Sequence, residues 1–132
     1  MTQLTKLILL TWGLLITFAL GAAELKSAAI TPDLLYQALN DQNPPLLVDI
    51  RSPDEYSSGH IPQAINIPMP LLAKRLSELK QAGDLVLYCN DSRLTRMAER
   101  ILLRKKFKDF KHLGGGYKAW SETNLPIETR LE

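Results

Sequence analysis

Short apolar runs alternate along this chain with segments in which apolar residues recur at helical spacing. The runs occupy residues 28–30, 46–50, 65–67, 85–88 and 110–113. Their lengths are typical of strands, and the run 46–50 is apolar on both sides apart from Asp49, as in a strand that is covered on both faces. Strands that alternate with helices in this way predict an α/β fold with a central parallel sheet and helices on both of its faces.

Capping residues indicate where several helices begin. Thr31 before Pro32 predicts a helix start, and Ser52 with Glu55 three residues later has the capping-box spacing of a short helix that ends at Gly59. Further helices are predicted over 70–83, over 95–106 and from 117 onward. The residues expected on the inward side of the helix 95–106 are Leu94, Ala98, Ile101 and Leu102.

The first 23 residues differ from the rest of the chain. Lys6 precedes an apolar run over 7–20 that ends in the small residues 21–23, which is the order of a secretory signal peptide with Glu24 as the first mature residue. An uncleaved N-terminal membrane anchor is the alternative, because the run is near the shortest that spans a bilayer, about 17 residues. Both interpretations place the remaining domain, 24–132, outside the cytoplasm, so we expect a periplasmic or otherwise exported protein.

Composition limits the classes of partner and cofactor. The chain has 16 Lys and Arg residues against 14 Asp and Glu residues, so its bulk charge predicts no binding to nucleic acid. A single cysteine excludes an intramolecular disulfide, and one cysteine with two histidines does not make up a zinc site. We therefore expect neither a metal nor another cofactor.

Cys89 is the residue best placed for chemistry. It ends the predicted strand 85–88, and the polar loop 90–95 and a helix follow it. The amides of such a loop and the positive end of a helix favour the thiolate, which is the nucleophilic form of cysteine. The alternative is a buried, inert thiol that closes the end of a strand.

Five motifs in order make the chain similar to the single-domain rhodanese family of sulfurtransferases, and most similar to its small exported members. They are Leu47-Val48-Asp49-Ile50-Arg51, Glu55-Tyr56 with Gly59-His60-Ile61-Pro62, Ala64-Ile65-Asn66-Ile67-Pro68, Tyr88-Cys89 with its loop, and Gly114-Gly115-Gly116-Tyr117-Lys118-Ala119-Trp120. The resemblance extends over nearly all of 24–132 and implies a single rhodanese-like domain.

The resemblance also implies an activity, that of a thiosulfate sulfurtransferase. The Cys89 thiolate would take the outer sulfur of thiosulfate, hold it as a persulfide and pass it to a thiol or to cyanide. The guanidinium of Arg93 would supply positive charge for the anionic donor, and Asp91 would point to solvent. The Thr95 hydroxyl is expected to cap the helix, and contact with the thiolate is its alternative role. The residues expected to bind the donor are Asn90, Asp91, Ser92, Arg93, Leu94, Thr95 and Arg51.

Ser92 departs from the family pattern, which usually has glycine at the third place after the cysteine. If the backbone there needs a positive φ, a serine strains the loop. The alternative function is therefore a weakly catalytic or non-catalytic module that carries sulfur or binds a partner. A phosphatase with a Cys-x5-Arg loop, which shares the fold, is disfavoured because Thr95 stands at its arginine position.

Arg51 and His60 each have two interpretations. Arg51 is either a buried partner of Asp49, which we favour, or a lining residue of the Cys89 pocket. His60, in a Gly-His-Ile-Pro turn, is expected to be a hydrogen-bonded structural residue rather than a general base.

Arginines recur along the helix after Cys89, at positions 93, 96, 100 and 104. Their spacing of three or four residues puts them on one side of the helix. A solvated helix face is the favoured interpretation, and the alternative is a docking surface in which Arg96, Arg100 and Arg104 attract an acidic partner protein.

Overall fold

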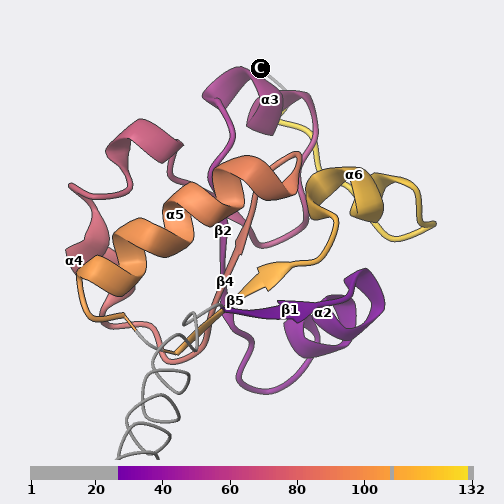
Figure 1. Ribbon diagram of the computed structural model, residues 1–132. Helices are drawn as coiled ribbons and strands as arrows, with labels where there is room; N and C mark the ends of the chain where they lie inside the picture. Colours follow the sequence, from indigo (N-terminus) through magenta and orange to yellow (C-terminus); the bar gives the residue numbers. More distant parts are fainter. Residues whose placement is uncertain (1–26, 108, 131–132) are drawn as a thin grey trace, which may run out of the picture.

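The computed structural model describes residues 27–107 and 109–130 of the chain. The predicted leader and its cleavage site lie outside these residues. Within the described part, no helix has the length and apolar character needed to cross a membrane. The predicted α/β fold is confirmed: a parallel sheet of five strands forms the centre of the domain, and helices flank it (Figure 1).

The strands of the sheet are β1 (Ala28–Ile30), β2 (Leu46–Asp49), β3 (Ile65–Asn66), β4 (Leu85–Tyr88) and β5 (Phe110–Leu113). Their order is β1-β5-β4-β2-β3, and every neighbouring pair is parallel. β1, β4 and β5 coincide with the predicted runs, and β2 and β3 each end one residue before the end of theirs. Because β4 is central and all of its residues are buried, the chain leaves the sheet after Tyr88 at the middle of its carboxyl edge.

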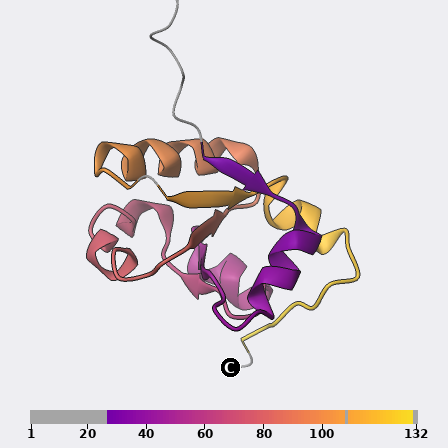
Figure 2. The same cartoon turned by 90° about the horizontal axis from the view of Figure 1, so that it is seen from below.

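The helical elements are α2 (Pro32–Leu39), α3 (Pro53–Ser58), the 3-10 helix η1 (Met69–Leu71), α4 (Leu76–Leu79), α5 (Ser92–Arg104) and α6 (Gly116–Ser121). Side chains of α4 and α5 belong to one buried cluster, which includes Leu79 and Leu102. Side chains of α2 and α6 belong to a second cluster, which includes Leu35 and Trp120. Figure 2 shows α5 above β4 and β5, and α2 below them. The sheet therefore separates two apolar layers.

The predicted caps of α2 and α3 are confirmed. The Thr31 side chain accepts a hydrogen bond from the Leu34 amide, and Pro32 is the first helical residue. Ser52 and Glu55 form a reciprocal capping box at the start of α3. Each arrangement satisfies amides that have no partner within the helix.

Two helix predictions need correction. The helix expected over 70–83 is in fact η1 followed by the single turn of α4, and Leu71, the last residue of η1, is 43% exposed. The helix expected to start at 95 begins at Ser92, because the Asp91 side chain caps it by accepting a hydrogen bond from the Arg93 amide. The prediction that Leu94 faces the core is also wrong, since Leu94 is 40% exposed.

Candidate active site

Cys89 lies directly after β4, on the face of the sheet that α5 covers. Side chains alternate along the strand, so Leu87 and Cys89 join the cluster beneath α4 and α5, while Tyr88 joins the other cluster. The residue is only 1% exposed. It nevertheless lines a cavity of about 380 Å³, whose other lining residues are Asn90, Asp91, Arg93 and Leu94.

Burial and hydrogen bonding act on the Cys89 thiol in opposite directions. Burial raises its pKa, whereas the backbone amides of Asn90 and Asp91 donate to the sulfur and lower it. The carboxylates of Asp49 and Asp91 act with burial, and the net result is a pKa above that of an ordinary cysteine. The loop amides thus point at the sulfur as the sequence predicts, but the prediction that the thiolate is favoured overall is wrong, because desolvation is the larger effect.

The start of α6 holds the backbone of Cys89 in place. The Tyr117 amide donates to the Cys89 carbonyl oxygen over 2.7 Å. Gly116 has a φ of +63°, and a Cβ at this position would overlap the Cys89 and Asn90 carbonyl oxygens. Only glycine adopts this conformation freely and lets the two segments approach so closely. The triple glycine therefore supports the loop from behind.

The start of α3 holds the loop from another side. The side-chain amide nitrogen of Asn90 (Nδ2) donates to one oxygen of the Glu55 carboxylate, and the other oxygen accepts from the Ser52 backbone and hydroxyl. The hydrogen bonds from Ser52 and Asn90 lower the pKa of Glu55, so it stays ionised. The sequence pattern indicates Glu55 only as a capping residue. Its contact with Asn90 joins residues 35 apart, and no local pattern signals it.

The loop residues predicted to bind the donor fall into two groups. Asn90, Asp91, Arg93 and Leu94 share the cavity with Cys89. The Arg93 side chain is 86% exposed, and its guanidinium lies 3.7 Å from the Asp91 carboxylate, which is itself 56% exposed, as predicted. The cavity therefore has an exposed cation at its rim, and the Asp91 carboxylate partly neutralises it.

Ser92 and Thr95 line a different cavity, of about 200 Å³, together with Arg96, Glu99 and His112. The prediction that the Thr95 hydroxyl caps the helix is wrong, because Asp91 is the cap and the buried hydroxyl donates to the Asp91 carbonyl. Strain at Ser92 is also absent: among the described residues, the only ones with positive φ other than glycine are Gln63 and Lys106. Ser92 is the first residue of α5, where helical backbone suits a serine.

Arg51 is the buried partner of Asp49, the interpretation that the sequence favoured. Its NH2 group lies 2.6 Å from one Asp49 oxygen and 2.7 Å from the Gly59 carbonyl oxygen. Its guanidinium lies 3.8 Å from the centre of the Tyr117 ring. Burial opposes the charge, but the hydrogen bond and attraction of Asp49 leave the pKa of Arg51 raised. Arg51 is not among the residues that line the Cys89 cavity, so its assignment as a donor-binding residue is corrected.

His60 is a structural residue, as predicted. Its Nδ1 lies 2.8 Å from the Tyr56 carbonyl oxygen, and its ring stacks on the Tyr56 ring with the centroids 3.8 Å apart. Its Nε2 is 3.6 Å from the Glu128 carboxylate. These contacts tie the C-terminal segment to the turn after α3, and none of them reaches Cys89.

Comparison with known proteins decides the family. The rhodanese-like domain model matches residues 31–123. The chain belongs to the rhodanese-like domain family. A sulfurtransferase of Allochromatium vinosum is 38% identical over 98 residues, which cover 74% of this chain and 92% of that protein. Several further relatives are larger proteins of which the chain spans only a part.

Solved structures of rhodanese domains share the fold. A thiosulfate sulfurtransferase from Pseudomonas aeruginosa is 29% identical, with a TM-score of 0.68 over 79% of this chain and 20% of that one. The rhodanese-like domain of the Anabaena protein Alr3790 is 25% identical, with a TM-score of 0.68 over 79% of this chain and 80% of that one. The rhodanese-like fold and the family predicted from the five motifs are confirmed.

This rhodanese domain contains a buried polar cluster that no local sequence pattern predicts. Glu99 of α5 is 5% exposed, and its carboxylate lies 3.1 Å from Nδ1 of His112 on β5. The Ser27 hydroxyl contacts both, at 2.6 Å from Nδ1 and at hydrogen-bonding distance from the carboxylate. A charged residue on the inward side of a helix is visible in the sequence, but its partners come from distant segments. The cluster fastens β1 to α5.

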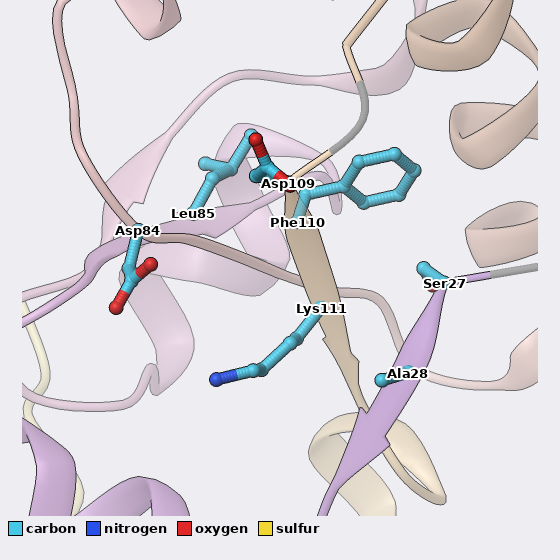
Figure 3. Close-up of a pocket in the computed structure, with 7 residues that line it drawn as sticks. All are labelled: Ser27, Ala28, Asp84, Leu85, Asp109, Phe110 and Lys111. Carbon is cyan, nitrogen blue, oxygen red and sulfur yellow. The ribbon is translucent and has the colours of Figure 1, made fainter.

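A third hollow of the rhodanese domain lies at the opposite edge of the sheet, near the amino ends of β4 and β5. It measures about 310 Å³ (Figure 3). The Asp84, Asp109 and Lys111 side chains surround it, and no part of the Cys89 loop does. Within 27–107 and 109–130, no three His, Cys, Asp or Glu residues are grouped so as to hold a metal ion.

Proposed function

We propose that this protein transfers sulfane sulfur from thiosulfate to a thiol or cyanide through a persulfide on Cys89. One observation carries the proposal: the Cys89 sulfur receives two loop amides and shares a cavity with the Arg93 guanidinium. Amides and a guanidinium bind oxyanions, and a cavity beside the sulfur gives the donor a place to react. The kinship with a sulfurtransferase of Allochromatium vinosum supports the same conclusion.

The proposed reaction has two steps and needs no metal. The Cys89 thiolate attacks the outer sulfur of thiosulfate, the bond between the two sulfur atoms of the donor breaks, and its electron pair leaves with sulfite. Cyanide or an acceptor thiolate then attacks the outer sulfur of the persulfide and releases the Cys89 thiolate. The loop amides stabilise negative charge on the Cys89 sulfur at the start and end of this cycle.

The test measures both steps with the full chain. Thiosulfate alone should release sulfite and add about 32 Da to Cys89, seen by intact mass and peptide mapping. Addition of cyanide should then yield thiocyanate and restore the original mass. Absence of both the added sulfur and thiocyanate would exclude the proposal.

Burial of Cys89 supports a second candidate, a weakly catalytic sulfur carrier. A thiol that is 1% exposed and whose pKa is raised reacts more slowly than an exposed thiolate. A carrier would acquire the persulfide but transfer it slowly to cyanide. Persulfide formation without turnover in the same assay would favour this candidate.

The pH dependence of sulfur loading follows from the raised pKa of Cys89. Only the thiolate attacks, so below its pKa the rate falls about tenfold for each pH unit. The rate of sulfite release in a single turnover should therefore still rise above about pH 8.5, where an ordinary cysteine is half ionised. A rate that is level from neutral pH upward would show that the thiolate is already formed.

Arg93→Ala should raise the KM for thiosulfate by about three- to tenfold, because an exposed cation contributes on the order of 1 kcal/mol to binding an anion. The rate with an uncharged donor, such as dimethyl trisulfide, should change less. Arg96→Ala is the matched control, since Arg96 lines the neighbouring cavity. An equal loss for both donors would contradict a role in binding the anion.

We also propose that the domain acts outside the cytoplasm. The support is the order of charged, apolar and small residues over 1–23. Intact mass of the protein recovered from the cell envelope distinguishes a mature chain that starts at Glu24 from a retained membrane anchor. A full-length chain in the cytoplasm would exclude both.

A further inference from the structure

One side of α5 is basic over its whole length. At 100° per residue, Met97, Arg100 and Arg104 lie within about 40° of the direction of Arg93, and Arg96 lies just beside them. The fully buried residues Ala98 and Leu102 lie on the opposite side. α5 runs along the outside of the domain (Figure 1), and all five residues of this basic face are exposed: Arg93, Arg96, Met97, Arg100 and Arg104.

The charge of the basic face is almost uncompensated. Arg93 has an acidic neighbour, Asp91, at 3.7 Å. Within 27–107 and 109–130, no carboxylate lies within ion-pair distance of Arg96, Arg100 or Arg104. Glu99 is the single acidic residue of α5, and it is buried against His112. An ordinary solvated helix face mixes both signs of charge, so this face projects a positive field.

The basic face begins at the rim of the Cys89 cavity. Arg93 belongs to both, and the exposed side chain of Leu94 lines the cavity beside it. From there the face extends for about 16 Å to Arg104, at 1.5 Å per residue. Met97, which is 53% exposed, adds an apolar contact between the charges. Arginine and methionine are enriched at protein interfaces.

We propose that the basic face docks an acidic protein that carries the acceptor thiol. This inference rests on the proposed sulfur transfer and names the class of acceptor. Cyanide and other small acceptors do not reach from Cys89 to Arg104, so the distal arginines serve a larger, extended anion. A membrane would lie over the cavity where the face begins and close it, whereas a protein with carboxylates beside its thiol places that thiol at Cys89.

The transfer itself is balanced without an oxidant. The acceptor thiolate attacks the outer sulfur of the Cys89 persulfide, and a bond forms between the two. The bond between that sulfur and Cys89 breaks, and its electron pair stays on the Cys89 thiolate. The acceptor leaves with a persulfide, and docking raises the local concentration of its thiol.

The experiment uses the full chain in detergent, loaded with thiosulfate and freed of the excess. The probes are a short peptide with one cysteine flanked by glutamates, the same peptide with glutamines, and cyanide. R100E/R104E is compared with K111E/K118E, which changes the charge equally on the other side of the sheet: Lys111 precedes His112, which faces α5, and Lys118 is on α6. R100Q/R104Q provides a milder change should charge reversal disturb the helix.

R100E/R104E should slow transfer to the glutamate peptide by about tenfold or more, with a smaller loss in R100Q/R104Q. Its rates with the glutamine peptide and cyanide, and all rates of K111E/K118E, should stay within about twofold of wild type. Salt should slow only the glutamate peptide. Equal rates for all variants, or an equal loss with cyanide, would overturn the proposal.

Failure of the proposed sulfur chemistry is recognised separately. If wild-type protein does not load sulfur, fluorescence anisotropy of the labelled glutamate peptide measures docking alone. Binding that R100E/R104E weakens and K111E/K118E does not would support the docking surface. Binding to phosphatidylglycerol vesicles that R100E/R104E abolishes, with peptide binding unchanged, would overturn it in favour of a membrane.

Discussion

Cys89→Ser is expected to lower sulfur transfer from thiosulfate to cyanide by at least about a thousandfold. A serine hydroxyl ionises far above neutral pH and does not hold sulfane sulfur as a persulfide does. The two amides that face the Cys89 sulfur do not compensate for this loss, because they stabilise a charge that the hydroxyl does not carry. Thiocyanate formation and the intact mass after thiosulfate treatment measure the two steps.

A folded but inactive variant is needed for a clear result. Cys89 is buried among apolar side chains, and serine is close to it in size, so the melting temperature and the circular dichroism spectrum should show a native fold. Turnover that survives in Cys89→Ser would remove the persulfide mechanism. An unfolded variant calls for Cys89→Ala, which places no hydroxyl in the apolar cluster.

Arg51→Met is expected to reduce the free energy of unfolding by about 3–5 kcal/mol, the usual cost of leaving one member of a buried ion pair alone. Asp49 is fully buried, and it loses the guanidinium that holds it at 2.6 Å. The Gly59 carbonyl also loses a donor. Urea denaturation followed by circular dichroism measures the change.

Two further variants show whether the loss of stability comes from breaking the buried ion pair or from removing an arginine. Arg75→Met removes an exposed arginine that pairs with Glu78, and it should hardly change the stability. Asp49→Leu/Arg51→Met removes both buried charges and should recover much of the loss. A small effect of Arg51→Met alone, similar to that of Arg75→Met, would show that water reaches Asp49.

The sequence predicted one contact of Arg51 and not its position relative to the Cys89 cavity. Its pairing with Asp49 was the favoured interpretation, because charges at the end of a buried strand usually pair. Its exclusion from the cavity depended on the stacking with Tyr117, which belongs to a segment 66 residues away. The spacing of residues in the sequence does not show toward which side of the sheet a long side chain at the end of a strand points.

Some helix caps could be predicted from the sequence, and one could not. Thr31 and Ser52 act through neighbours three residues away, so local pattern was sufficient to predict their caps. At α5, the sequence pattern indicated only Thr95 as the cap, and Asp91 was expected to point to solvent. Asp91 is the cap, because it stands directly before the first residue of the helix, and the Thr95 hydroxyl donates to the Asp91 carbonyl instead. The position of the helix start, which the sequence placed three residues too late, decided between the two.

The sequence by itself determined the alternation of strands and helices, the position of Cys89 at the end of a buried strand, and the family. These follow from interactions between residues close in the chain and from motifs that can be read in order. The tertiary structure decided the burial of Cys89, the support of its loop by Glu55 and Gly116, and the pairing of Glu99 with His112. Desolvation and contacts between distant segments set these properties, because they depend on which side chains surround a group after folding.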